Sequence, residues 1–443
     1  MTARRWSERL GLHRPELRAW ALYDWAYSAM ITTITTAVFP IYFVKVAARD
    51  VAGPAATARL AWVSGVALAV AAVVSPVLGA LADQAPIKRR GLGICMVLGV
   101  AATAGLWWVG PGDLTLASWL FAAVIVGGTA SFVFYEALLP HLARPDEIDR
   151  VSTAGYALGY VGGGTLLALN LAWILRPALF GLPTGPGLSP AQATLPTRLA
   201  FLSVAVWWLG FGALAIRRLP EPAVRQAHPG TGSAVRAAMA QLAHTARLLR
   251  QYPQAGLLLL AFLIYNDGIQ TIIKMATAYG TEIGIGQGAL IGSILLVQFV
   301  GIPCAFLFGA LADRIGTKPA ILLGLAVYGV ISVFGYYMRT GTHFLILALL
   351  VGTVQGGTQA LSRSLFATLI PAERSGEFFG LFSVFEKVAG IFGPLFFAAA
   401  IWISGSSRNA ILSVIAFFVV GALLLGRLDV EGGRRQAREP AGT

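Results

Sequence analysis

Four polar side chains recur at helical spacing inside an otherwise apolar stretch: Asp267, Gln270, Thr271 and Lys274. Positions i, i+3, i+4 and i+7 share one face of a helix, so the pattern predicts a polar stripe that faces a water-filled cavity. Ionisable groups inside a membrane span are costly and are functional candidates by default. The stripe is therefore predicted to bind substrate, while a clasp that only holds two helices together remains the alternative.

A second polar face begins at Asp24 and continues at helical spacing with Tyr27 and Ser28. Asp24 lies nearer the predicted cytoplasmic end of its helix, so it is either a gate residue or a ligand. Glu136 is a further carboxylate within an apolar run. We assign Tyr27 and Ser28 to substrate binding, and we assign proton coupling to three acids: Asp24, Glu136 and Asp267.

A third face carries Gln359 and Arg363 four residues apart. A guanidinium group binds a carboxylate with a two-pronged fork, so Arg363 is a candidate partner for a carboxylate-bearing substrate. Asn266 and Gln359 are expected to contribute to the same contact. An ion pair of Arg363 with Glu136 or Glu386 is an equally open role.

These side chains must be positioned by a membrane-embedded scaffold. The chain has 443 residues, of which 57% are hydrophobic and 12% charged, with a mean hydropathy of +0.72. A soluble domain carries about a quarter charged residues, so lipid must cover much of this surface. The net charge of +13 does not indicate nucleic-acid binding, because the basic residues lie in short connections between apolar runs.

About twelve apolar runs are long enough to cross a bilayer, since a helix needs about 20 residues to do so. They lie near 19–44, 60–82, 91–110, 114–138, 152–175, 198–216, 254–280, 287–311, 318–338, 343–366, 378–403 and 409–427.

Arginine and lysine gather in one set of connections, which predicts that both termini are cytoplasmic. The predicted organisation is a cytoplasmic segment, a six-helix bundle, a linker, a second six-helix bundle and a disordered tail. Their bounds are 1–18, 19–216, 217–252, 253–427 and 428–443. Within the linker, the basic stretch 236–250 is a candidate short surface helix.

The pentapeptide Gly-Ala-Leu-Ala-Asp occurs twice, at 79–83 and at 309–313, and each copy ends an apolar run. Copies at matching places in two membrane halves indicate an internal duplication. An aspartate at a cytoplasmic helix end can pair with a cation or cap a neighbouring helix in one conformation only. We therefore predict gating roles, and not substrate contacts, for Asp83, Asp313, Arg314 and Lys318.

No nucleotide-binding loop, metal-ligand cluster or catalytic triad is apparent, so we expect no cofactor, no metal and no enzyme activity. Cys95 and Cys304 fall in apolar runs and are predicted to be small core residues. Glycines crowd the run 155–164 and recur at Gly390 and Gly393. Close helix packing or a hinge explains both groups.

The segment 309–319, Gly-Ala-Leu-Ala-Asp-Arg-Ile-Gly-Thr-Lys-Pro, is similar to the signature loop between spans eight and nine of the major facilitator superfamily. The first copy departs from that signature at 84–86, where Gln-Ala-Pro stands. Four other segments resemble the vacuole-effluxer-like group of this superfamily: 20–28, 265–271, 359–366 and 376–381. Tyr27 stands where that group usually has Asn.

The resemblance implies an all-α membrane protein with twelve transmembrane helices in two six-helix bundles. It implies a proton-coupled amino-acid exporter that works by alternating rocking of the bundles, a monomer, in the inner cell membrane if the source is bacterial. Export of drugs or other hydrophobic compounds is an alternative, because 159–164 partly resembles an antiporter signature, with Tyr160 in place of Pro. A non-transporting receptor and a membrane-embedded enzyme are further alternatives.

Overall fold

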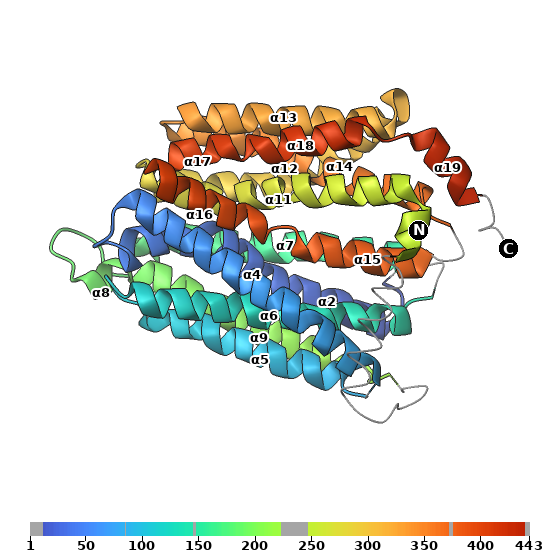
Figure 1. Ribbon diagram of the computed structural model, residues 1–443. Coiled ribbons are helices and arrows are strands. Elements are labelled where there is room, and N and C mark those ends of the chain that lie inside the picture. Colours follow the sequence, from blue (N-terminus) through green and yellow to red (C-terminus); the bar gives the residue numbers. More distant parts are fainter. Residues whose placement is uncertain (1–11, 85, 145–147, 223–246, 372–374, 439–443) are drawn as a thin grey trace. The chain divides into compact units, whose positions relative to one another are not determined.

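The computed structural model describes residues 12–84, 86–144, 148–222, 247–371 and 375–438, and within these ranges it is helical, without strands (Figure 1). The chain forms two compact units. Unit 1 comprises Met1–Ala52 and Val66–Ala238, and unit 2 comprises Gly53–Gly65 and Met239–Thr443.

Unit 1 begins with one long helical run, which is interrupted by two π-helical stretches. The elements of that run are α2 (Pro15–Met30), η1 (Ile31–Ala37), α3 (Val38–Tyr42) and η2 (Phe43–Ala47). The remaining helices of this half are α4 (Gly53–Gln84), α5 (Lys88–Gly105), η3 (Leu106–Trp108), α6 (Leu114–Leu142), α7 (Ile148–Leu175), η4 (Pro177–Phe180), α8 (Pro190–Ala193) and α9 (Leu195–Arg218). The first residues of α4, Gly53–Gly65, group with unit 2.

Helices α2 and α7 approach closely because α7 presents glycines to α2. A Cβ atom added to Gly162 would lie 2.5 Å from the carbonyl oxygen of Trp25, and one added to Gly163 would lie 2.9 Å from that of Ser28. Small residues let two helix backbones approach within the membrane. Of the two explanations for the glycine-rich run, the structure therefore shows close packing.

Unit 2 contains the second set of helices. They are η5 (Leu249–Gln251), α11 (Pro253–Glu282), α12 (Gln287–Ile315), α13 (Thr317–Tyr337), α14 (Gly341–Thr368), α15 (Ser375–Val388), α16 (Phe392–Ser404), α17 (Ser407–Ser413), α18 (Ile415–Gly426) and α19 (Val430–Arg438). Of the predicted surface helix of the linker, residues 236–246 lie outside the described part of the chain.

The predicted span 378–403 consists of two helices in the structure. The helix breaks between Val388 and Phe392, and Figure 1 shows α15 and α16 as separate segments. At the break Gly390 adopts a φ of 96°, a value that side chains other than glycine rarely tolerate. A positive φ cannot continue a right-handed helix, so the span divides here.

Ten helices in the described ranges are long and apolar enough to cross a membrane. Two shorter apolar helices, Gln287–Gly301 and Phe392–Ser404, add to them. The prediction of an all-α, membrane-spanning chain is confirmed at this level.

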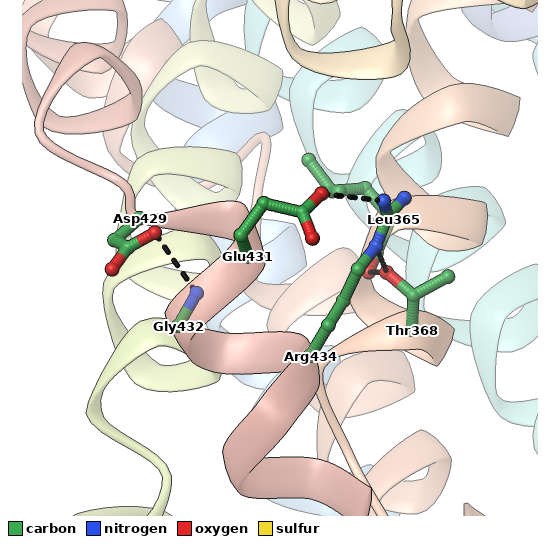
Figure 2. A network of polar contacts seen from close by, with 6 residues as sticks. All are labelled: Leu365, Thr368, Asp429, Glu431, Gly432 and Arg434. Atoms are coloured by element: carbon green, nitrogen blue, oxygen red, sulfur yellow. Dashed lines mark hydrogen bonds and ion pairs between the residues drawn. The ribbon is translucent and has the colours of Figure 1, made fainter.

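Of the tail predicted to be disordered, residues 430–438 form α19, which Figure 2 shows beside the end of α14, and residues 439–443 lie outside the described part of the chain. Asp429 starts the helix, because its Oδ1 accepts a 2.9 Å hydrogen bond from the Gly432 N–H. Arg434 then bonds Glu431 at 3.1 Å, and Gln436 donates to the Gln251 carbonyl at 2.6 Å. The Gly- and Arg-rich composition suggested disorder, but a local cap and contacts within unit 2 order 430–438.

A similar contact is found at the start of α5 in unit 1 and at the start of α13 in unit 2, as an internal duplication predicts. In unit 1, the Arg89 guanidinium donates to the Leu219 carbonyl at 3.4 Å, just past the end of α9. In unit 2, Lys318 Nζ donates to the carbonyls of Gly426 and Leu428 at 2.8 Å each, at the end of α18. Cations stabilise the carbonyl end of a helix, so both units use one device at matching positions.

Candidate functional site

The buried end of the polar stripe on α11 meets the break between α15 and α16. Asp267 is 2% exposed, and its Oδ1 accepts a 2.6 Å hydrogen bond from the backbone N–H of Gly390. The backbone N–H groups of Phe392 and Gly393 face the same carboxylate. The carboxylate thus occupies the start of α16, where free N–H groups and the helix dipole favour a negative charge.

A glycine at position 393 allows α16 to lie against Asp267. A Cβ atom at Gly393 would lie 3.0 Å from Asp267 Oδ1 and 2.8 Å from the carbonyl oxygen of the same residue. The backbone of the break therefore lies directly against α11. Thr271 packs here too, and its hydroxyl donates to the Asp267 carbonyl at 2.7 Å, so that hydroxyl is already satisfied within the helix.

Lys274 reaches the same break from two turns further along α11. A Cβ atom at Gly390 would lie 2.7 Å from Lys274 Nζ and 3.2 Å from the Cβ of Gln270. Lys274 is partly buried, and within the described residues it forms no hydrogen bond and no ion pair within 4 Å. Three members of the predicted stripe (Asp267, Gln270 and Lys274) thus meet at one backbone segment.

Helices α11 and α14 are joined by two polar contacts. Gln359 Nε2 donates to Asn266 Oδ1 at 3.0 Å, and the hydroxyls of Tyr265 and Ser362 lie 2.5 Å apart. The structure therefore brings together Asn266 and Gln359, as the sequence analysis expected. In this state their amide groups contact each other, so this pair is also an interhelical clasp.

Arg363 does not join that pair. Its side chain is exposed, and the guanidinium carbon lies 5.7 Å from the centre of the Phe379 ring, within range of a cation–π contact. Glu386, one of the two ion-pair partners considered for Arg363, belongs to the same unit. Glu136, the other partner considered, belongs to unit 1.

In unit 1, Asp24 is 5% exposed and is held by two hydroxyls. Ser28 Oγ donates to its Oδ1 at 3.1 Å, and Tyr135 Oη donates to its Oδ2 at 3.4 Å. A Cβ atom at Gly159 would lie 2.9 Å from Oδ1, so α7 closes directly over the carboxylate. The charged side chain that acts on Asp24 is another acid, the partly buried Glu136.

Aromatic rings fix the surroundings of Asp24. Trp20 stacks on Tyr135 with ring centres 4.3 Å apart, and its Nε1 donates to the Tyr135 carbonyl at 3.0 Å. Tyr27 stacks on Phe132 at 4.8 Å, so its ring belongs to this layer. The sequence analysis missed the contact of Tyr135, although a tyrosine adjacent to Glu136 inside a span was an available signal.

The predicted gating residues are placed only in part. The side chains of Asp83 and Asp313 lie outside the described residues. Arg314 is exposed at the end of α12, and Lys318 is bound to the carbonyls that end α18. Gating by these four residues stays a prediction.

A further carboxylate in unit 2 was not anticipated. Glu282 ends α11, and its Oε2 accepts hydrogen bonds from Thr57 Oγ1 at 2.6 Å and from Ser407 Oγ at 2.5 Å. Two hydroxyls on one carboxylate oxygen join the first turn of α4 and the first turn of α17 to the end of α11. A lone acid at a span end was the signal in the sequence.

The fold is similar to solved transporters over almost the whole chain. A mutant form of the nucleoside transporter NupG matches with a TM-score of 0.67 and 14% identity, over 94% of this chain and 100% of that one. A bacterial homolog of the human lysosomal transporter Spinster, inward-facing and unoccupied, matches with a TM-score of 0.65 and 12% identity, over 100% of both chains. A D-xylose-proton symporter gives a TM-score of 0.66 at 14% identity, over 94% of this chain and 97% of that one.

Relatives by sequence give the same class. The MFS-type transporter YxiO of Bacillus subtilis (strain 168) is 35% identical over 415 residues, which cover 93% of this chain and 94% of that protein. The chain is therefore a transporter of the major facilitator superfamily. The family model described as "Vacuole effluxer Atg22 like" matches residues 13–438, and the chain belongs to this family.

A fungal relative is more distant. Autophagy-related protein 22 of Cryptococcus neoformans var. neoformans serotype D is 27% identical over 311 residues, which cover 66% of this chain. The match covers 52% of the fungal protein, so this chain spans about half the length of that relative.

Proposed function

We propose that the protein is a proton-linked secondary transporter for efflux of a small polar solute, an amino acid. It works by alternating rocking of two six-helix bundles, as twelve spans with both termini cytoplasmic. It acts as a monomer, in the inner cell membrane if the source is bacterial. Membership of a family described as vacuole effluxer and a structural neighbour described as a proton symporter support this assignment.

The observation that carries the proposal is the position of Asp267. Its carboxylate is 2% exposed inside an apolar helix and is held by backbone N–H groups at a helix break. A buried ionisable group within a span is expensive to maintain, so it marks a pathway for substrate or protons. A break in a span supplies unpaired backbone groups that bind ions or substrate.

Asp24, which lies in unit 1, is a second buried acid in addition to Asp267 of unit 2. It is 5% exposed, and Glu136 is the charged group acting on it. Carboxylates inside a span mark proton pathways in pumps and transporters. We therefore assign Asp24 and Glu136 to proton transfer, with Tyr27 and Ser28 as the polar surface beside them.

Flux into vesicles tests the proposal. The purified protein is reconstituted, and uptake of radiolabelled L-amino acids is measured after an imposed pH step. We expect the wild-type protein to concentrate an amino acid in response to the step, and Asp267→Asn to lose this response. The matched control is Asp50→Asn, because that side chain is 71% exposed and its pair with Arg49 is a surface contact of little energy.

Two results contradict the proposal. If Asp267→Asn still concentrates amino acid after the pH step, Asp267 does not carry the coupling proton. If the wild-type protein moves hydrophobic cations and no amino acid, drug export replaces amino-acid efflux. Separately, an Arg363→Ala variant with unchanged affinity would remove Arg363 from the substrate site.

A further inference from the structure

The start of α16 already holds a carboxylate, that of Asp267. We propose that this helix start, together with Lys274, is the binding site for the carboxylate group of the cargo, and that Asp267 occupies it while cargo is absent. The inference rests on the proposed function, since it takes the cargo to bear a carboxylate. It moves the predicted carboxylate contact from Arg363 to the α15–α16 break.

The backbone at the break is suited to a carboxylate. The N–H of Gly390 bonds Asp267 Oδ1 at 2.6 Å, and the N–H groups of Phe392 and Gly393 face the same group. Helix starts bind carboxylates and phosphates through such free N–H groups and the helix dipole. Glycine at 390 and at 393 leaves these N–H groups uncovered by side chains.

Lys274 is the second component. Its ammonium lies beside Gly390, where an added Cβ would come within 2.7 Å of Nζ, and it has no hydrogen bond or ion pair in the described part of the chain. A cation without a partner inside a span is costly. An arriving carboxylate gives Lys274 a partner, whereas in this state Asp267 acts on it only at longer range.

The charges around Asp267 determine how cargo and protons are linked. Lys274 is the charged side chain that acts on Asp267. Among the described residues, Gln359 from α14 and the rings of Phe417 and Phe418 from α18 lie beside this part of α11, and on α15 the side chain of Glu386 is exposed. Asp267 and Lys274 carry opposite charges, and a cargo carboxylate at the same helix start would place a second negative group beside that of Asp267.

Protonation of Asp267 removes the negative charge that competes with the cargo carboxylate and frees the N–H groups of the break. The carboxyl oxygen gains a proton, its hydrogen bond from Gly390 weakens, and the cargo carboxylate takes its place. Binding of the proton and of the cargo therefore favour each other, by thermodynamic linkage. Proton and amino acid then cross the membrane in the same direction.

The proposal is tested by measuring equilibrium binding to the purified full-length protein in lipid nanodiscs. The probes are the twenty standard L-amino acids and, for each one that binds, its amide, which keeps the ammonium and lacks the carboxylate. We expect Asp267→Asn to bind these amino acids about tenfold or more tightly than wild type at neutral pH, because the internal competitor is gone. Wild-type affinity rises as the pH falls, and Asp267→Asn affinity changes little.

Lys274→Met is expected to weaken amino-acid binding about tenfold, and Lys274→Arg, which keeps the charge, is expected to restore it. Asp50→Asn is the control, because that side chain is 71% exposed and its contact with Arg49 is a surface pair. Weaker binding by Asp267→Asn, equal binding of an amino acid and its amide, or no binding of any of the twenty overturns the proposal. Tighter binding by Asp267→Asn with no pH-driven flux in wild-type vesicles contradicts the proposed function and leaves the site intact.

Discussion

Asp267 of α11 accepts a 2.6 Å hydrogen bond from the backbone N–H of Gly390, so a side chain of one span holds the break in another. The contact places a carboxylate where α16 begins, and it brings Gln270 and Lys274 to the same segment. The polar face of α11 and the break between α15 and α16 are therefore in direct contact. Four predictions test this arrangement and three other contacts of the fold.

Gly390→Ala should destabilise the protein and abolish transport. The φ of 96° is strained for alanine, at a cost of about 1–2 kcal/mol, and the new methyl group would displace the Lys274 ammonium from the break. Thermal unfolding in detergent and vesicle flux measure the two effects. Gly329→Ala is the control. This glycine lies in the middle of α13 with no atom within 4 Å of the added methyl group, so the change should be neutral or slightly stabilising. An unchanged Tm for Gly390→Ala would mean that the break is not strained in this way.

Gly162→Ala should separate α2 from α7. The added methyl group would lie 2.5 Å from the carbonyl oxygen of Trp25, and a backbone atom cannot move aside cheaply. Overpacking of this kind costs about 1–3 kcal/mol, so we expect a lower Tm. Gly210→Ala in α9, where nothing lies within 4 Å of the new atom, should leave the Tm unchanged. Equal behaviour of the two variants would count against close packing.

Ser407→Ala should loosen the end of α11. It removes a 2.5 Å hydrogen bond to the Glu282 carboxylate, and bonds to charged groups contribute about 1.5–3 kcal/mol. Thermal unfolding of the purified protein should therefore shift to a lower temperature. Ser413→Ala is the matched control, because that hydroxyl only bonds the Ala410 carbonyl. A Ser407→Ala variant as stable as the control would show that Thr57 alone satisfies Glu282.

Lys318→Met should destabilise unit 2 at the end of α18. The variant loses two 2.8 Å hydrogen bonds, to the carbonyls of Gly426 and Leu428, and a cation at a helix end contributes about 0.3–1 kcal/mol beyond them. Arg314→Met removes an exposed cation of the same connection and should have little effect on the Tm. If transport fails in Lys318→Met while the Tm is unchanged, the gating role predicted for Lys318 gains support.

Much of the scaffold could be predicted from the chain because membrane helices are local structures. Runs of about 20 apolar residues, the duplicated pentapeptide and the face shared by Asp267, Gln270 and Lys274 are all visible in the order of residues. The tail was predicted less well. Its composition suggested disorder, whereas Asp429 caps a helix that packs on unit 2.

Which side chains share a helix face follows from the order of residues alone, because helical periodicity depends only on spacing. What each face meets is known only from the folded chain. Gln359 pairs with Asn266, Arg363 turns to Phe379, and the partner of Asp267 is the backbone of a break 123 residues away. Such contacts depend on how distant segments approach one another, and a backbone N–H carries no signature in the residue that supplies it.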